Sequence, residues 1–392
     1  MEVFDLCKEY CIGCGLCQSE LHTNMENDVR GFAHPVFKKN EESERFLREV
    51  CPISDSFADN DVGELWGKAK AVYAGYSTDE DIRKKASSGG FLTEMAIFLL
   101  ESGKVDGILQ VAADEKNPIA TVAQVSRTKE QVIKCCGSRY SISSPWCKLS
   151  SCIREGEKYA AIGKPCDIRA LKRLKKFNSQ YEGICYLLSF FCAGLPSRKA
   201  NEELLRKLGC EEKACSSLTY RGNGWPGYAT AVDDKGIEHK MEYSQAWGKI
   251  LGRDINMYCR LCLDGIGESA DIACGDGWYI AENGEPDFSE REGRNVIFAR
   301  TEKGDRLVKE AAEACRVEVL PWDNVETLKK IQKYQYTRKT TMRAKIKAYA
   351  LMGRKTPRFH KPILKKYAQM TSVKEKFRVF GGTVKRILNK KI

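Results

Sequence analysis

The chain has 392 residues, enough for two or three domains with substantial cores, and a formal net charge of +12. Its 18 cysteines are unevenly spaced, which excludes a repeated disulfide scaffold, and no run approaches the roughly 18 apolar residues of a membrane-spanning helix. The chain begins without the basic and apolar segments of a signal peptide, so we expect a cytoplasmic protein with reduced thiols.

The first chemical motif is a C-x2-C-x2-C triplet at Cys11, Cys14 and Cys17. A loop of this spacing presents three thiolates to an iron–sulfur cluster, which takes one thiolate per iron. Gly13 and Gly15 permit the tight wrap, because glycine adopts positive φ without steric cost. The motif therefore predicts a [4Fe–4S] cluster close to the N-terminus.

The fourth ligand of this cluster is not in the usual place. Leu21 occupies the position where bacterial ferredoxins carry a cysteine followed by proline, and in two-cluster ferredoxins that cysteine binds the other cluster. Cys51, followed by Pro52, is the predicted replacement, whereas Cys7 is a weaker alternative because it would have to fold back over the same loop. Structural zinc is the rival interpretation, although zinc favours two separated C-x2-C pairs.

The middle of the chain alternates between two kinds of pattern. Apolar, β-rich segments predict strands at residues 69–76, 107–112, 159–162, 183–191, 270–273 and 295–299. Amphipathic spacing predicts helices at residues 90–102, 168–176, 197–208 and 303–314. Such alternation favours an α/β (α+β) layer architecture.

Two polar segments lie on this scaffold. The first is Ser87, Ser88, Gly89 and Gly90, directly before a predicted helix, and the second includes Arg139 and Tyr140. Amides at a helix start, with hydroxyls beside them, can bind phosphate oxygens, although a plain helix cap explains the first segment equally well. Neither segment is a Walker loop or a G-x-G-x-x-G fingerprint, so neither ATP nor a Rossmann-bound dinucleotide follows.

A glycine-rich loop at residues 220–227 is the best candidate for contact with a substrate. Arg221, Asn223 and Trp225 give it a cation, a polar group and a stacking ring, although a plain turn explains the loop about as well. Asp276 and Trp278 follow a predicted strand, and both are expected close to a bound cofactor; Trp278 is also a candidate for contact with the substrate. The four histidines lie outside these motifs, so a hydrolytic triad has little support.

The positive charge is confined to the end of the chain. Residues 341–392 hold 16 Lys and Arg against one acidic residue, Glu375, so this segment carries +15 and the other 340 residues about −3. Apolar and cationic residues alternate there, as in a helix that lies on an anionic membrane surface. A solvated helix or a disordered end is an equal alternative, and nucleic acid is not expected because no binding fold accompanies the charge.

Taken in order, these motifs resemble the coenzyme F420 hydrogenase/dehydrogenase β-subunit family, iron–sulfur flavoproteins that are related to 7-hydroxymethyl chlorophyll a reductase. The resemblance covers about residues 5–320. The segments that carry it are the cysteine triplet and residues 87–91, 137–140, 163–166, 191–197, 259–262 and 270–276. Each motif is modest alone, but their order is specific.

The resemblance implies a ferredoxin-like [4Fe–4S] module at residues 1–65, an α/β flavin and second-cluster domain at 66–325, and a basic amphipathic tail at 326–392. It implies FAD, with FMN as the alternative, and makes the two polar segments and Asp276 cofactor contacts. The ligands that it implies for a second [4Fe–4S] cluster are Cys166, Cys192, Cys259 and Cys262. The alternative is that these are buried thiols packing as small hydrophobic groups, and the role of Cys274 stays open.

The expected function is that of an iron–sulfur flavoprotein oxidoreductase. It would pass electrons between ferredoxin, or reduced coenzyme F420, and a small-molecule substrate through two [4Fe–4S] clusters and a flavin. The long basic tail resembles that of members in bacterial surface-polysaccharide pathways, which suggests a sugar or lipid-linked sugar as substrate and peripheral contact with the inner membrane surface. The alternatives are a non-catalytic electron-transfer subunit of a larger redox complex and a zinc-stabilised binding protein.

Overall fold

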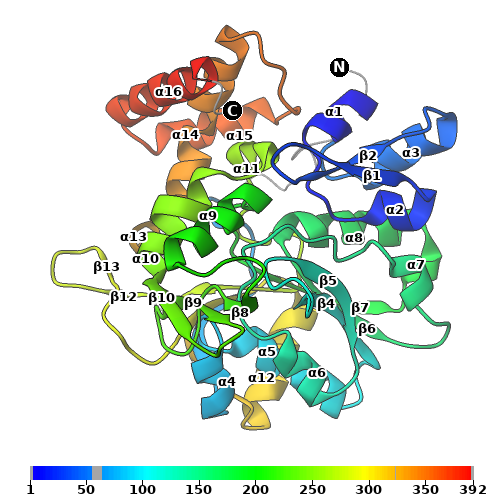
Figure 1. The fold of residues 1–392 in the computed structure, drawn as a ribbon, viewed down its shortest axis with the longest axis vertical. Helices are drawn as coiled ribbons and strands as arrows, with labels where there is room; N and C mark the ends of the chain where they lie inside the picture. The colour runs from blue at the N-terminus through cyan, green and yellow to red at the C-terminus, as the bar shows by residue number, and fades with distance from the viewer. Residues whose placement is uncertain (1–2, 55–63, 323, 390–392) are drawn as a thin grey trace.

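The computed structural model describes residues 3–54, 64–322 and 324–389. Within them the central element is an eight-stranded mixed sheet of order β15-β3-β14-β11-β7-β6-β4-β5 (Figure 1). Its strands are β3 (Ala71–Ser77), β4 (Gly107–Ala113), β5 (Thr121–Ser126), β6 (Tyr159–Gly163), β7 (Ile184–Phe190), β11 (Ile272–Asp276), β14 (Asn295–Ala299) and β15 (Val317–Pro321). The four strands β4, β6, β7 and β11 are parallel, and the outer strands add antiparallel on both sides.

The α/β architecture predicted from the alternating patterns is confirmed. All six predicted strands belong to the central sheet, and β14 has the predicted bounds. Strand β11 begins two residues later than expected and continues to Asp276, so this carboxylate ends the strand instead of following it. The four predicted helices are α5 (Phe91–Glu101), α8 (Pro165–Phe177), α9 (Arg198–Leu208) and α12 (Glu302–Glu313).

Helices cover both faces of the sheet. Leu188 of β7 packs in a core with α5 and α12, whereas the preceding Leu187 packs in a second core with α8. Successive side chains of a strand point to opposite faces, so the two cores lie on opposite sides of the sheet. Both faces of the parallel strands are therefore buried, as their continuous apolar sequences require.

A second, three-stranded antiparallel sheet was not predicted. It has the order β10-β9-β8 and consists of β8 (Cys215–Thr219), β9 (Tyr228–Asp233) and β10 (Glu238–Glu242). It shares a core with α9, which begins where the Ser197 hydroxyl accepts a hydrogen bond from the Ala200 N–H at 3.0 Å. The glycine-rich loop connects β8 with β9.

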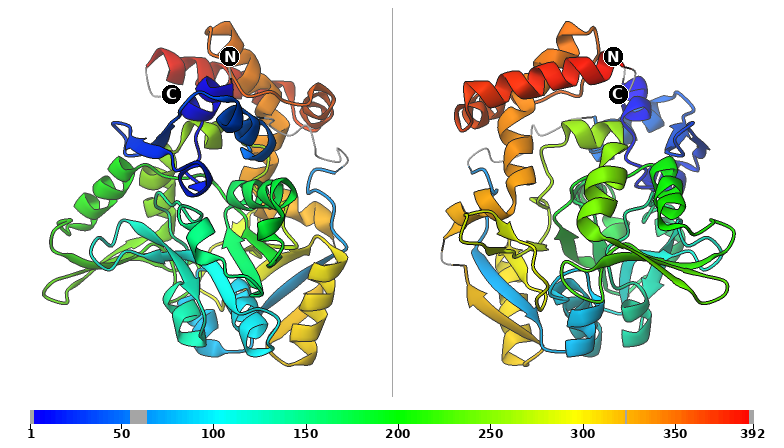
Figure 2. Two further views of the ribbon diagram at one scale, coloured as in Figure 1. Left: turned by 90° about the vertical axis from the view of Figure 1, so that its right-hand side faces the viewer. Right: turned by 60° about the vertical axis from the view of Figure 1, so that its left-hand side comes forward.

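The N-terminal part is a small unit of helices and one hairpin. It contains α1 (Val3–Glu9), α2 (Leu16–Leu21), the hairpin β1 (Asn24–Asn27) and β2 (Ala33–Val36), and α3 (Glu41–Val50). Figure 2 shows this unit at the same end of the molecule as the C-terminal helices. Shorter elements are α4 (Glu80–Lys85), α6 (Lys129–Lys134), α7 (Leu149–Cys152), α10 (Tyr243–Gln245), α11 (Met257–Leu261), α13 (Leu328–Ile331), β12 (Tyr279–Ile280) and β13 (Pro286–Asp287).

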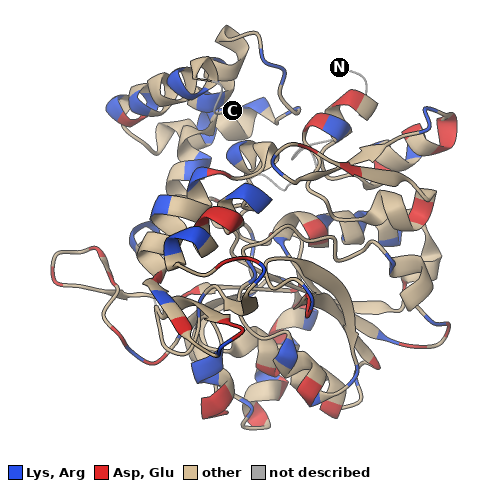
Figure 3. Ribbon diagram, in the orientation of Figure 1, with Lys and Arg blue, Asp and Glu red and all other residues tan. Residues whose placement is uncertain are grey.

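After the short α13, the basic tail forms three longer helices that pack on the rest of the protein. They are α14 (Lys333–Leu351), α15 (Lys361–Gln369) and α16 (Val373–Leu388), and Figure 3 shows the Lys and Arg residues along them. Met342, Tyr349 and Ile387 share one core with Cys7 and Ile12 of the N-terminal unit. None of the helices in the described ranges is long and apolar enough to span a bilayer. Of the residues in the predicted segments 1–65, 66–325 and 326–392, residues 1–2, 55–63, 323 and 390–392 lie outside those ranges.

Candidate functional site

The cysteine triplet lies on a loop that is held close to the central domain. Gly15 has φ of +89° and starts α2, and a Cβ at this position would lie 2.5 Å from the backbone nitrogen of Cys147. The Cys14 carbonyl accepts a hydrogen bond from the Trp146 N–H at 3.0 Å. Glycine is therefore required at position 15 both for its conformation and for the close approach of a second segment.

Cys51 reaches this loop from the end of α3. Its thiol accepts a hydrogen bond from Cys7. This bond lowers the pKa of Cys51, and its effect is larger than that of burial, which acts in the opposite direction. Burial is the main cause that raises the pKa of Cys11 to about 12, and the charge of Cys51 is a smaller cause. Cys14 and Cys17 interact electrostatically with the same thiol. The structure thus brings the four predicted thiols together and adds Cys7 beside them.

The choice between Cys51 and Cys7 as the fourth ligand can be tested directly. We expect Cys51→Ser to lower the iron content of the anaerobically purified protein from about eight to about four per chain, because one cube is lost. Cys7→Ser is expected to retain the iron, because Cys51, and not Cys7, is the predicted fourth ligand. Iron loss in Cys7→Ser with retention in Cys51→Ser would assign the ligand to Cys7.

The four inner cysteines line one cavity. Cys166 follows β6 and begins α8, Cys192 follows β7, and Cys259 and Cys262 lie on and directly after α11. The carboxyl ends of parallel strands meet at one edge of a sheet, which is why the first two converge. The cavity is small, with a volume of ≈ 20 Å³, and the Cys259 sulfur accepts a hydrogen bond from the Leu195 N–H at 3.3 Å.

Two cations face the same cavity. The Lys164 ammonium lies 2.7 Å from the buried Asp167 carboxylate, and the Arg338 guanidinium donates to the Cys192 carbonyl at 3.1 Å. Burial raises the pKa of Cys192, whereas Arg338 and then Lys164 act in the opposite direction. Arg338 therefore supplies positive charge that can offset thiolates at this site, whereas Lys164 is paired with Asp167, which acts against it at Cys166.

The inner site fits an iron–sulfur cluster by its donors. Four thiols line a cavity with cations beside it, and the Arg338 Nε is buried without a hydrogen-bond partner. A cluster takes one thiolate per iron, so its ligands surround the group instead of meeting at one atom. Among the described residues, no three His, Cys, Asp or Glu side chains form a group that could hold a metal ion.

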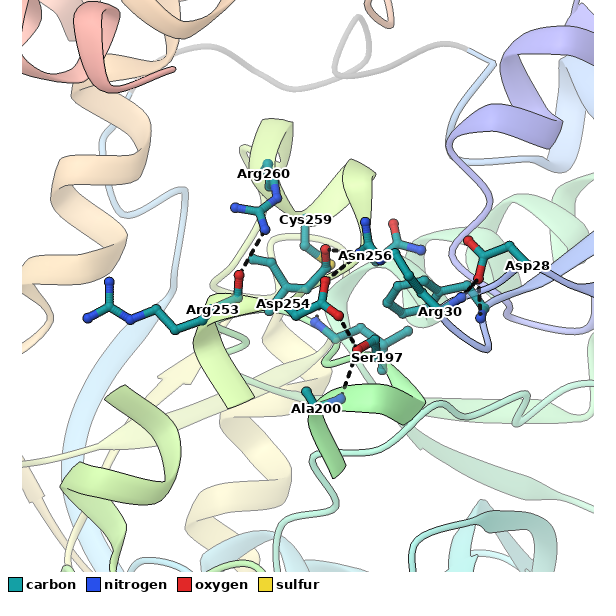
Figure 4. A network of polar contacts seen from close by, with 12 residues as sticks. Asp28, Arg30, Ser197, Ala200, Arg253, Asp254, Asn256, Cys259 and Arg260 are labelled. Carbon is teal, nitrogen blue, oxygen red and sulfur yellow. Dashed lines mark hydrogen bonds and ion pairs between the residues drawn. The ribbon is translucent and has the colours of Figure 1, made fainter. Parts of the chain in front are cut away.

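The outer and inner cysteine groups are adjacent. Ile12, between Cys11 and Cys14 in the sequence, lines the inner cavity. Asn256 lies three residues before Cys259, and its side-chain amide donates a hydrogen bond to the Cys11 carbonyl at 2.9 Å. Figure 4 shows Asn256 beside Cys259 and Arg30, and the Arg30 guanidinium lies 3.1 Å from the Asp254 carboxylate. Hydrogen bonds and an ion pair thus join the N-terminal unit to the inner site.

A pocket rich in aromatic side chains lies on the other side of the inner cavity. Phe191 and Ala193 line the pocket, whereas Cys192 and Gly194 line the cavity, so successive residues of one segment face the two spaces alternately. The remaining ring-bearing residues of the pocket are Tyr140, Tyr228, Tyr243, Trp247, Trp278, Phe288 and Tyr334, together with the prolines Pro226 and Pro286. One stretch of backbone therefore separates the pocket from the inner cysteines.

Four residues predicted for cofactor or substrate contact form one cluster at this pocket. The Arg221 guanidinium makes two 2.8 Å bonds to the Asp276 carboxylate, and the Trp225 indole donates to the same carboxylate at 3.1 Å. The rings of Trp225 and Trp278 stack with centroids 4.3 Å apart. Asp276 and Trp278 line the pocket, whereas Arg221 and Trp225 are buried behind them. Asn223 is exposed in the left-handed region and is not part of this cluster.

The serine-rich turn is bonded to neighbouring segments. The Ser87 hydroxyl accepts from the Ser138 N–H at 2.7 Å and donates to the Arg221 carbonyl at 3.1 Å. The Ser88 hydroxyl donates to the Arg294 carbonyl at 2.9 Å. These bonds hold the turn against the β8–β9 loop and the segment before β14, and they occupy both predicted phosphate-binding hydroxyls in this conformation.

The other predicted phosphate contacts are also engaged. Gly90 precedes α5 with φ of +74°, and a Cβ at Gly89 would lie 2.7 Å from the Asn295 side-chain oxygen. The Arg139 guanidinium donates to the carbonyls of Leu218 at 2.8 Å and Ala120 at 3.1 Å. Tyr140 alone of the second polar segment lines the pocket. The assignment of Ser87, Ser88, Gly89, Gly90 and Arg139 to flavin phosphate stays a prediction.

Two site residues had no role in the sequence-based predictions. Lys164 belongs to one of the motifs that carry the resemblance, but no function was predicted for it. Its position two residues before the predicted ligand Cys166 was the available signal, and the structure shows that it is buried. Arg338 belongs to the tail and lies more than 70 residues from the last predicted ligand. No local pattern marks it, because only the packing of α14 brings it to Cys192.

Comparison with known proteins identifies the family. Residues 72–150 match the model of the N-terminal part of the coenzyme F420 hydrogenase/dehydrogenase β subunit, and residues 156–325 match the model of its C-terminal part. Together these matches span well over half of the sequence, and the chain belongs to the coenzyme F420 hydrogenase/dehydrogenase β-subunit family, as the resemblance predicted. Neither model covers the N-terminal cysteine unit or the basic tail.

Named relatives are redox proteins. The chain is 28% identical over 275 residues to coenzyme F420 hydrogenase subunit beta of Methanococcus voltae, which covers 67% of this chain and 88% of that protein. It is 28% identical to F420-dependent formate dehydrogenase 1 subunit beta of Methanococcus maripaludis, over 61% of this chain and 59% of that protein. Coenzyme F420-dependent sulfite reductase of Methanocaldococcus jannaschii is 26% identical, over 74% of this chain and 43% of that protein.

A solved structure has a similar fold. A chain of the F420-reducing [NiFe] hydrogenase complex from Methanosarcina barkeri matches with a TM-score of 0.59 and 20% sequence identity. The match covers 75% of this chain and 98% of that chain. The fold is therefore that of a known redox-complex subunit.

Proposed function

We propose that this protein is an electron-transfer subunit of a redox complex, which connects a cofactor in the aromatic pocket with a partner protein through two [4Fe–4S] clusters. The observation that carries the proposal is the serial arrangement of three sites. The pocket shares the segment 191–194 with the inner cysteine cavity, and the inner cavity shares Ile12 with the outer cysteine loop. Adjacent redox centres in this order form a path for electrons.

In this proposal Cys11, Cys14, Cys17 and Cys51 hold the outer cluster, and Cys166, Cys192, Cys259 and Cys262 hold the inner one. When bound, such clusters supply one-electron transfer, and a flavin supplies exchange between one-electron and two-electron steps. Lys164 and Arg338 stabilise the thiolates of the inner site. The apolar residues around both sites exclude water, which strengthens these electrostatic effects.

The aromatic pocket is the proposed site of FAD, or of FMN, and of contact with a reduced deazaflavin such as coenzyme F420. Tyr140 supplies a flat surface for a heterocyclic ring, whereas Trp278 is buried, stacks on Trp225 and forms part of the pocket wall. The two hydrogen bonds between Arg221 and Asp276 hold the Asp276 side chain, which lines the pocket, in place. The names of the relatives support F420 as the exchange partner, because F420 is part of the names of the hydrogenase, formate dehydrogenase and sulfite reductase relatives.

A second candidate function is an oxidoreductase that reduces its own small-molecule substrate. The pocket favours it, because the pocket is open and includes the polar side chains Glu242, Glu290 and Lys333 beside its rings. Ferredoxin is the proposed electron donor in that case. The role in surface-polysaccharide biosynthesis and the sugar substrate rest on the resemblance of the tail and stay predictions.

One anaerobic purification tests the proposal. We expect about eight irons, as two four-iron cubes require, and one flavin per chain. Reduced F420 should then reduce the clusters within the isolated chain, and the electrons should pass to a redox protein added in excess. Turnover of a small-molecule acceptor by the isolated chain would instead favour the oxidoreductase, and a colourless protein with zinc would exclude both.

A further inference from the structure

Helix α16 presents an exposed apolar ridge. Val373, Phe377 and Leu388 are 63%, 72% and 65% exposed, and Val384 is half-buried between them. At about 100° per residue, these four side chains fall within about 60° of the helix circumference. The three exposed side chains do not contribute to the core, and with Val384 they lie along one side of the helix.

A row of cations runs along one side of the ridge. Lys374, Arg378 and Lys385 are exposed and occupy about the next 80° of the same helix. The opposite side of α16 contains Thr383 and Ile387, which are buried. The helix therefore has three sectors: one packed on the protein, one exposed and apolar, and one exposed and cationic.

The surroundings of the ridge are also positively charged. Residues 341–392 contain 16 Lys and Arg and only one acidic residue, Glu375. That carboxylate lies 2.5 Å from Arg378, so it neutralises a single cation. Figure 3 shows α16 at the outer end of the molecule, with Lys and Arg along its length.

We infer that α16 lies flat on an anionic lipid surface, with the ridge in the interface and the cations on the headgroups. An apolar face flanked by Lys and Arg binds such surfaces, because buried apolar area and electrostatic attraction add. Long cationic side chains reach the headgroups while their stems cover apolar surface. This inference concerns residues outside the family match and is independent of the proposed electron path.

Two other occupants fit the ridge less well. A second copy of this chain would bring a tail of the same charge and would be repelled. A specific protein partner buries about 800 Å² on each side, more than a ridge of four side chains one helix wide provides. A lipid surface needs only the flat contact that the ridge offers.

The test uses point variants of the full-length protein, because α14 to α16 share a core with the N-terminal unit and deletion would disturb it. Co-sedimentation is measured with vesicles of phosphatidylcholine mixed with phosphatidylglycerol, and with vesicles of phosphatidylcholine alone. We expect binding only to the mixed vesicles. Both Phe377→Ser/Leu388→Ser and Lys374→Gln/Lys385→Gln should reduce this binding by about tenfold or more.

Matched controls change the same kinds of residue elsewhere. Val29→Ser/Ile237→Ser removes two exposed apolar side chains, and Lys116→Gln/Lys235→Gln removes two exposed cations. Both controls should bind the mixed vesicles like the unmodified protein. Equal losses in controls and ridge variants, or no binding by the unmodified protein, would overturn the inference. Unchanged vesicle binding, with loss of contact to an acidic redox protein, would assign the ridge to that protein.

Discussion

If the proposed inner cluster is present, replacement of Cys259 by serine is expected to remove about four of the roughly eight irons that two four-iron cubes would supply, because that cluster would lose one of its four proposed thiolate ligands. The loss should be accompanied by a failure of reduced F420 to reduce the outer cluster. The inner cavity borders the pocket along residues 191–194 and borders the outer loop at Ile12, so the proposed electron path runs through it. Iron analysis and the absorbance of the reduced protein measure both effects.

The control for this variant is Cys315→Ser. Cys315 is exposed on the turn after α12 and lies outside both cysteine groups. Its replacement should leave the iron content and cluster reduction unchanged. A Cys259→Ser protein that retains all its iron would show that Cys259 is a packing thiol and would remove the inner cluster from the proposal.

Replacement of Arg221 by methionine is expected to cost about 3–5 kcal/mol of unfolding free energy, because the Asp276 carboxylate loses its bidentate partner. Arg221 is only 3% exposed. Burial, the largest single effect, opposes its charge, but Asp276 together with Tyr243 and Tyr140 raises the pKa of the guanidinium. Denaturant unfolding, monitored by the fluorescence of the stacked Trp225 and Trp278, measures the change.

An exposed ion pair provides the matched control. Arg291 lies 2.7 Å from Asp287, but its side chain is 49% exposed, so Arg291→Met should cost less than about 1 kcal/mol. The double variant Arg221→Met/Asp276→Leu should recover part of the stability, since removing both charges avoids an unpaired one. If Arg221→Met is no more destabilising than Arg291→Met, the buried pair does not stabilise the pocket wall.

The parts of the site that sequence could predict are those with a local pattern. Strand periodicity located β6 and β7, and Cys166 and Cys192 follow their ends, so their convergence could be predicted from the geometry of a parallel sheet. The spacing of Cys11, Cys14 and Cys17 fixed the outer loop in the same way. No local spacing links Cys51 to this loop, because it lies at the end of α3, more than 30 residues after Cys17. The structure places it beside the other thiols of the outer loop.

The remaining parts depend on contacts that leave no local pattern. Helix α14 buries Gln335, Arg338 and Lys339 against carbonyls and carboxylates, so by composition it resembles a solvated helix. The strands β8 to β10 are short and half-exposed. Their apolar and polar residues alternate too weakly for the sequence to predict them as strands. Ser87 and Arg139 looked available for a ligand because their partners, the Arg221 and Leu218 carbonyls, are distant in sequence.

The shared core of the two ends of the chain constrains the order of assembly. Val3, Cys7 and Ile12 pack with Met342 and the other tail residues Tyr349, Leu364 and Ile387. Domains usually fold from the N-terminus as synthesis proceeds. Here the earliest cysteine loop cannot reach its final packing until the last helix has left the ribosome. The final packing of the outer cysteine loop is therefore expected late in folding, although Cys11, Cys14, Cys17 and Cys51 all belong to the part of the chain that is synthesised first.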